Sequence, residues 1–126
     1  MKLNHECVRD LLLLLELVPY DGGSESDLQQ VIESSNISDL FDLDTFYYTF
    51  IELIDGGFVD GRKYQQMPDA YAFTKITYKG HEFLDNIRDN TNWEETKSTI
   101  ASKMGSASLN IFSSVAAKLI ENKFGL

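Results

Sequence analysis

The chain has 126 residues, of which 43% are hydrophobic and 25% charged, enough for one soluble domain to bury a core without help from a metal ion. Its single cysteine excludes an internal disulfide and favours a reducing, cytoplasmic setting, and no apolar run approaches the ~20 residues of a membrane-spanning helix. The net charge of −9 disfavours a general attraction to the phosphates of nucleic acids.

The first predicted element is a helix from Asn4, a good N-cap residue, to Val18, before the break at Pro19. The run of leucines at 11–15 places apolar side chains on every side, so we expect this helix to be buried on more than one side. Charged residues on both flanks distinguish the run from the core of a signal peptide. The main apolar stripe consists of Cys7, Val8, Leu11, Leu12, Leu15 and Val18.

Two further helices of unequal strength are predicted next. Residues 24–35 open with a capping-box spacing from Ser24 to Asp27, but the segment is short and rich in serine. A stronger pattern begins at Asp42 and ends at the two glycines 56–57. Its core stripe consists of Phe46, Phe50, Leu53 and Ile54.

The hydrophobic period then changes to that of strands. Residues 57–64 and 70–77 read as a hairpin joined by the polar turn 65–69. Tyr71 and Phe73 alternate with small residues in the second strand, which predicts one half-buried face.

Three helices complete the chain. Thr77 is expected to cap a helix over 78–89, and the capping box that starts at Thr91 opens another helix to Met104. A final amphipathic helix is predicted over 108–124. The apolar sides of the first and the last of these helices consist of Phe83, Leu84 and Ile87, and of Phe112, Val115, Ala116, Leu119, Ile120 and Phe124.

This order of elements is that of a winged helix-turn-helix, so the predicted class is a mostly helical α+β fold with a two-stranded wing and a helical C-terminal extension. We expect one compact domain, in which residues 91–126 pack on the first helix of a winged-helix part over 1–90 and cover its second apolar side. Lys118 and Lys123 are too few for a membrane-surface helix. A homodimer through the first or the last helix is the next alternative for the apolar stripe of 108–124.

Four stretches of the chain resemble a known family: "MKLNHECVRDLLLLLE", "GFVDGRKY", "ITYKGHEFLDNIRDNTNWEETK" and "FSSVAAKLIENKFGL". They resemble the DUF2513 family, a domain of unknown function found mostly in bacteria, their phages and prophages. The resemblance covers nearly the whole chain, is weakest over 19–41, and is most specific in "GHEFLDNIRDNTNW". It implies a winged-helix fold in a mobile-element setting and supplies no activity or catalytic residue.

The segment "HEFLD" (81–85) approaches a zinc-protease helix, with His81 and Asp85 as ligands and Glu82 as base. The competing interpretation is a structural helix. In it Thr77 is the N-cap, and the helix dipole favours the carboxylates of Glu82 and Asp85 in the first turns. Because the second histidine of the motif is missing and only His5 remains elsewhere, the structural interpretation is favoured.

The remaining chemistry also argues against an enzyme. His5 and Cys7 could suggest a base and a nucleophile, but two residues two apart on a helix point to different sides. Cys7 fits a core position, which favours a buried and inert thiol. The glycines lack the spacing and the lysine of a phosphate-binding loop, so we expect no cofactor.

The third helix argues against the usual DNA-binding mode of a winged helix. Residues 10–61 contain twelve Asp or Glu and no Lys or Arg, and each carboxylate near DNA is repelled. We therefore expect this helix to dock another protein, either a basic or a nucleic-acid-binding one, with a solvated acidic face as the alternative. The candidate protein-binding residues are Asp42, Asp44, Thr45, Tyr48, Thr49, Glu52 and Asp55.

The alternative function is a DNA-binding transcriptional regulator that contacts DNA through its wing. The basic and amide residues around the wing would neutralise only ~4 phosphates, and they also fit an ordinary solvated hairpin edge. The candidate DNA contacts are Arg62, Lys63, Gln65, Gln66, Lys75 and Lys79.

Overall fold

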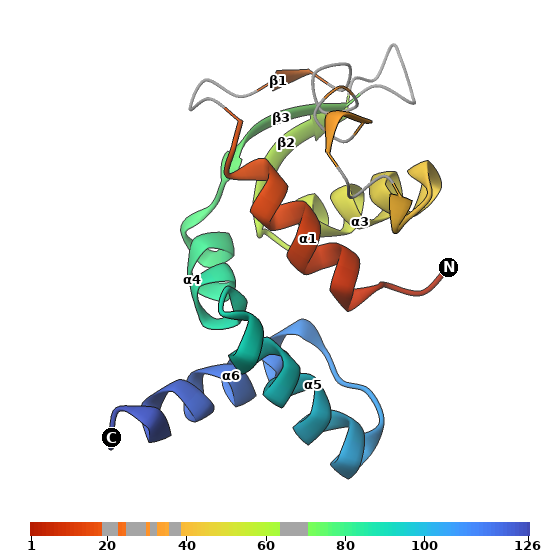
Figure 1. Ribbon diagram of the computed structural model, residues 1–126. Helices are drawn as coiled ribbons and strands as arrows, with labels where there is room; N and C mark the ends of the chain where they lie inside the picture. Colours follow the sequence, from red (N-terminus) through yellow and green to blue (C-terminus); the bar gives the residue numbers. More distant parts are fainter. Residues whose placement is uncertain (19–22, 25–29, 31–32, 36–38, 64–70) are drawn as a thin grey trace. The chain divides into compact units, whose positions relative to one another are not determined.

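The computed structural model describes residues 1–18, 23–24, 30, 33–35, 39–63 and 71–126 (Figure 1). It divides into two compact units, Met1–His81 and Glu82–Leu126. The fold is mostly helical α+β, and five helices and one antiparallel sheet lie within the described residues. None of these helices combines the length and the apolar character needed to cross a membrane.

Helix α1 (His5–Leu15) begins as predicted, because the Asn4 side chain accepts a hydrogen bond from the Cys7 amide at 3.1 Å. It ends three residues before the predicted Val18. Leu17 and Val18 donate to the carbonyls three residues earlier, which tightens the last turn, and a residue before proline is disfavoured in helical conformation. Leu14 is buried along with the predicted stripe except Val18, which is half-buried, so the buried face is wider than one stripe.

Helix α3 (Leu43–Asp55) confirms the predicted start and end. Asp42 is its N-cap, and Gly56 follows its last residue, with Gly57 in the left-handed region at φ 81°. The core residues Phe46, Phe50 and Leu53 are buried, and Ile54 is half-buried. Helices α1 and α3 pack against each other and against the same sheet (Figure 1).

The sheet contains the predicted hairpin and one strand that the sequence analysis missed. Strands β2 (Val59–Lys63) and β3 (Tyr71–Ile76) are antiparallel, and β1 (Gly23–Ser24) pairs with the other edge of β3. Ser24, predicted as a helix cap, therefore lies in a strand. A strand of two residues is too short to show a hydrophobic period, so β1 is recognised only by its pairing with β3. Most of the predicted helix 24–35 and the whole turn 65–69 lie outside the described residues.

A bulge in β3 directs two large side chains into the core. Asp60 pairs with Lys75 but Gly61 pairs with Phe73, which leaves Thr74 as the extra residue. In an uninterrupted strand Phe73 and Ile76 would face opposite sides, yet both are buried here. Phe73 also contacts Phe50 of α3, with 6.4 Å between the ring centroids. The predicted burial of Phe73 is confirmed.

A hydrogen-bonded junction ties the start of α4 (Tyr78–Ile87) to the turn after α3. The Thr77 hydroxyl accepts from the Gly80 amide at 3.0 Å and donates to the Gly57 carbonyl at 2.6 Å. The Thr77 amide donates to the Phe58 carbonyl at 3.0 Å. The predicted cap is confirmed, although α4 ends two residues before the predicted residue 89.

The second unit contains α5 (Asn90–Met104) and α6 (Leu109–Lys123), which pack against each other. Asp89, rather than the predicted Thr91, caps α5 and accepts from the Asn92 amide at 2.8 Å. Both residues are good caps, and the earlier one lengthens the helix at its start. Ser108 caps α6, close to its predicted start at residue 108.

The contact between α5 and α6 centres on Trp93 and Phe112, whose ring centroids are 5.5 Å apart. The predicted core residues Phe112 and Ala116 are buried, whereas Val115, Leu119 and Ile120 are half-buried. Phe124 was predicted in this stripe but is 77% exposed, because it is the C-cap residue, past the last residue of α6. The predicted boundary at residue 90, the single compact domain and the packing of residues 91–126 on α1 stay predictions.

Candidate functional site

The exposed side of α3 carries three carboxylates around a tyrosine. Asp44, Tyr48, Glu52 and Asp55 are three or four residues apart, which places them on one side of the helix, and we call them the acidic face of α3. Asp44 and Asp55 are exposed, and Tyr48 and Glu52 are partly exposed. Four of the seven candidate protein-binding residues thus share one accessible surface.

The acidic face of α3 is electrostatically unfavourable within its own helix. Glu52 and Asp55 lie in the last turns, where the helix dipole favours positive charge, and no basic residue is present there. Like charges three or four residues apart also repel each other. A basic partner would relieve both effects.

Asp42 and Thr45, two further candidate protein-binding residues, form hydrogen bonds with each other at the start of α3. Asp42 accepts from the Thr45 amide at 2.8 Å and from the Thr45 hydroxyl at 2.6 Å. The bond from the hydroxyl, followed by that from the amide, lowers the pKa of Asp42. These two residues therefore act as a helix cap.

The prediction that Thr49 belongs to a docking surface is wrong. Its side chain is fully buried, and its hydroxyl donates to the Thr45 carbonyl at 2.7 Å. Thr49 follows Phe46 by three residues and directly precedes Phe50, so it faces the core with them. A hydroxyl that bonds its own helix can be buried at little cost, and polarity alone is therefore a poor guide to exposure.

Cys7 is buried, as predicted, and its thiol is held in the protonated form. Burial raises its pKa to about 11, against the opposing effect of a hydrogen bond with Thr49. The folded protein holds the proton more tightly than the unfolded chain, so this contribution to stability is present below pH 9 and is lost as the pH rises towards 11.

We expect Cys7 to react with the disulfide reagent DTNB on the order of 100-fold more slowly in the native protein than in urea at pH 8, because only the exposed thiolate attacks. Absorbance at 412 nm follows the reaction. Equal rates in both conditions would contradict the burial of this thiol.

The residues of the "HEFLD" segment do not form a cluster of metal ligands. In the described part of the chain no three His, Cys, Asp or Glu side chains lie close enough to hold one ion. His81 and Glu82 are exposed, and Asp85 accepts from Arg88 at 3.2 Å.

The basic residues near the predicted wing are not equivalent. Lys75 is exposed on β3, whereas the Lys79 ammonium donates to the Gly56 carbonyl at 3.1 Å and lies 4.6 Å from the centroid of the Phe58 ring. Lys79 therefore belongs to the junction between α3 and α4. The backbones of Arg62 and Lys63 lie in β2, and Gln65 and Gln66 lie outside the described residues.

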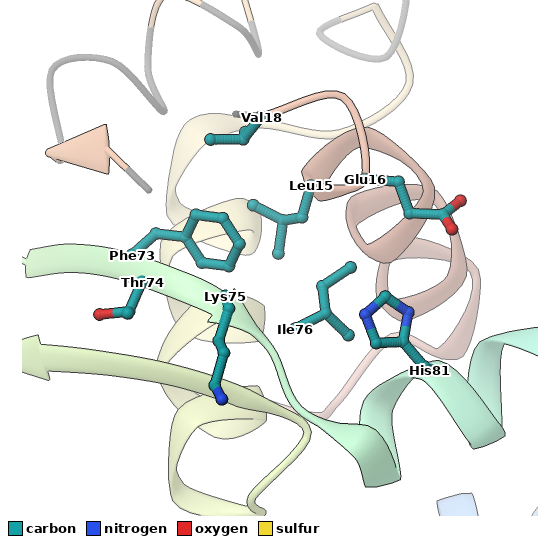
Figure 2. Close-up of a pocket in the computed structure, with 8 residues that line it drawn as sticks. All are labelled: Leu15, Glu16, Val18, Phe73, Thr74, Lys75, Ile76 and His81. Carbon is teal, nitrogen blue, oxygen red and sulfur yellow. The ribbon is translucent and has the colours of Figure 1, made fainter. Parts of the chain in front are cut away.

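A pocket of about 370 Å³ lies between the end of α1, strand β3 and the first turn of α4 (Figure 2). No local sequence pattern reveals this pocket, because the end of α1 and residues 73–81, which build it, are far apart in the chain. Four apolar side chains form its floor, and polar side chains surround them. The floor consists of Leu15, Val18, Phe73 and Ile76, and the rim of Glu16, Thr74, Lys75 and His81.

Comparison with known proteins supports the resemblance found in the sequence. The chain matches the family described as "Hypothetical protein (DUF2513)" over residues 2–107. An uncharacterized protein of Haemophilus influenzae is 31% identical over 121 residues, which cover 95% of this chain and 96% of that protein. No solved structure matches the chain.

Proposed function

Because the chain belongs to the DUF2513 family, whose description transfers no activity, we propose on physical grounds that it is a non-enzymatic winged-helix protein that binds a basic protein through the acidic face of α3. The order α1, β1, α3, β2, β3 supports the winged-helix assignment, with β2 and β3 as the wing.

The observation that carries the proposal is the side of α3 that faces away from the core. In a DNA-binding winged helix this surface would carry basic and amide groups, but here it presents three carboxylates around Tyr48. A partly exposed tyrosine within a charged rim is typical of protein interfaces. The complementary surface is rich in Lys and Arg, because opposite potentials steer association and fix its orientation.

A protein that normally binds nucleic acid fits this requirement best. Its basic groove is built to take up several negative charges, and Asp44, Glu52 and Asp55 present three such charges along one side of the helix. The protein would then act as an inhibitor whose carboxylates occupy phosphate positions. The mobile-element setting implied by the family resemblance agrees with this role.

The alternative, DNA binding through the wing, has less support. Lys79 would have to leave the Gly56 carbonyl and the Phe58 ring to reach a phosphate. Each phosphate contact that a basic side chain does not make also reduces the favourable free energy of counterion release.

Neutralising the acidic face of α3 tests the proposal. We expect Asp44→Asn/Glu52→Gln/Asp55→Asn to weaken binding to a basic partner about 100-fold, because each lost charge pair is worth on the order of 1 kcal/mol at an exposed interface. Partners would be captured from an extract of the encoding organism, identified by mass spectrometry and then titrated in purified form. The control Asp39→Asn/Glu82→Gln/Glu121→Gln removes three exposed carboxylates elsewhere and should bind normally.

Titration with mixed-sequence duplex DNA between about 50 and 200 mM salt separates the two functions. Steeply salt-dependent binding that Arg62→Ala/Lys63→Ala abolishes would overturn the proposal and favour the regulator. Equal loss of partner binding in the α3 variant and the control would show that net charge alone is responsible.

A further inference from the structure

We propose that the pocket between α1, β3 and α4 binds a small organic anion with an apolar body, of the size and character of a medium-chain carboxylic acid. The pocket volume of about 370 Å³ lies at the lower end of the range of ligand sites. The proposal is independent of the acidic face of α3.

The floor of the pocket selects an apolar body. Leu15, Phe73 and Ile76 are each less than 10% exposed, so their positions are set by the core. Figure 2 shows these side chains and Val18 around a common space. Transfer of an alkyl chain from water to such a surface is favourable in proportion to the apolar area that is buried.

The rim selects a negative head group. Within the described residues the Lys75 ammonium and the His81 ring have no hydrogen-bonding or ion-pairing side chain as a partner, and both are exposed. Asp60 is the cross-strand neighbour of Lys75, yet no ion pair joins them. The His81 ring at the edge of the apolar floor, and the Lys75 ammonium once its flexible stem turns towards it, offer hydrogen-bond donors to a carboxylate.

The one acidic residue of the lining does not reverse this preference. In Figure 2 the Glu16 carboxylate, like the Lys75 ammonium and the Thr74 hydroxyl, is directed away from the apolar side chains, but only Glu16 of these three has a further interaction within the described part of the protein. The His81 ring lies beside Ile76, at the end of the floor. The ammonium of Lys75 sits on a flexible four-carbon stem, which lets it turn over the pocket mouth.

The test compares three ligands that share an eight-carbon chain: octanoate, octanol and octyltrimethylammonium. Backbone amide shifts in ¹⁵N-labelled protein would report binding, with the largest shifts in β3 and at the end of α1. We expect octanoate to bind about tenfold more tightly than octanol, as one charge-assisted contact predicts, and the cation to bind least. Equal affinities for octanoate and octanol, or no shift at the pocket amides with about 5 mM octanoate, would overturn the proposal.

Two variants identify the head-group contacts. Lys75→Gln and His81→Ala should each weaken octanoate about threefold to tenfold and leave octanol unchanged, because the first removes a charge, the second removes the ring N–H donor, and both keep the apolar floor. Lys118→Gln makes the same charge change at a site on α6 and should not affect either ligand. Unchanged octanoate binding in both pocket variants would refute the role of the rim. Circular dichroism would verify that each variant is folded.

Discussion

Replacing Gly80 with alanine is expected to destabilise the protein by about 3 kcal/mol, the upper range for an added methyl group in a tightly packed site. A Cβ atom at this position would lie 2.0 Å from the Phe58 carbonyl oxygen and 2.7 Å from Ile76 Cγ2. The oxygen belongs to backbone that also accepts from the Thr77 amide, so it cannot yield without breaking the junction between α3 and α4. Urea unfolding followed by far-UV circular dichroism would measure the loss.

Gly105→Ala is the matched control for this substitution. A Cβ atom added at Gly105 would meet nothing within 4 Å, and only the φ of 78° disfavours a side chain there, so we expect a smaller loss of about 1 kcal/mol. A Gly80 variant as stable as the Gly105 variant would show that the first turn of α4 can move away from the Phe58 carbonyl.

The Gly80 junction also bears on the proposed ligand pocket. Gly80 directly precedes His81, and the Thr77 cap and the close approach to Phe58 place the first turn of α4 beside β3. Any variant that displaces this turn should therefore weaken octanoate binding as well as stability. Glycine is required here by the approach of two backbone segments.

Replacing Asn92 with alanine is expected to destabilise the second unit by about 2–3 kcal/mol, because it removes two hydrogen bonds that a buried amide donates to backbone carbonyl groups. Asn92 is 1% exposed, and its Nδ2 donates to the Asn86 carbonyl at 3.0 Å and to the Ala116 carbonyl at 3.2 Å. Lys123 donates to its Oδ1 at 3.4 Å. One side chain thus connects the last turn of α4 with α5 and α6.

Fluorescence of Trp93 would follow this loss directly. It is the one tryptophan of the chain, is buried next to Asn92 and contacts Phe112, so its emission reports the unfolding of the second unit.

Asn92→Asp is expected to be at least as damaging at neutral pH, since a carboxylate cannot donate to either carbonyl. The control Asn110→Ala changes an exposed amide on α6 and should alter stability by less than about 0.5 kcal/mol. An Asn92 variant no worse than this control would contradict the role of its hydrogen bonds.

The sequence by itself determined where α1, α3 and α4 begin, because capping is local. Asn4, Asp42 and Thr77 each bond an amide three residues later, and a motif of four residues contains the whole interaction. Hydrophobic period likewise predicted the core side of α3 and the β2–β3 hairpin. The acidic character of residues 10–61 also follows from the sequence, because it depends only on amino-acid composition.

Only the tertiary structure decided the features that depend on segments far apart in the chain. Strand β1 is defined by its pairing with β3, and the bulge at Thr74 by a change of register between β2 and β3. Thr49 is polar, yet its place beside Cys7 and the aromatic core buries it. The pocket unites residues 15, 16 and 18 with residues 73–76 and 81, which are far from them in the sequence. Local rules describe a residue and its near neighbours, whereas burial, register and cavities follow from how distant surfaces meet.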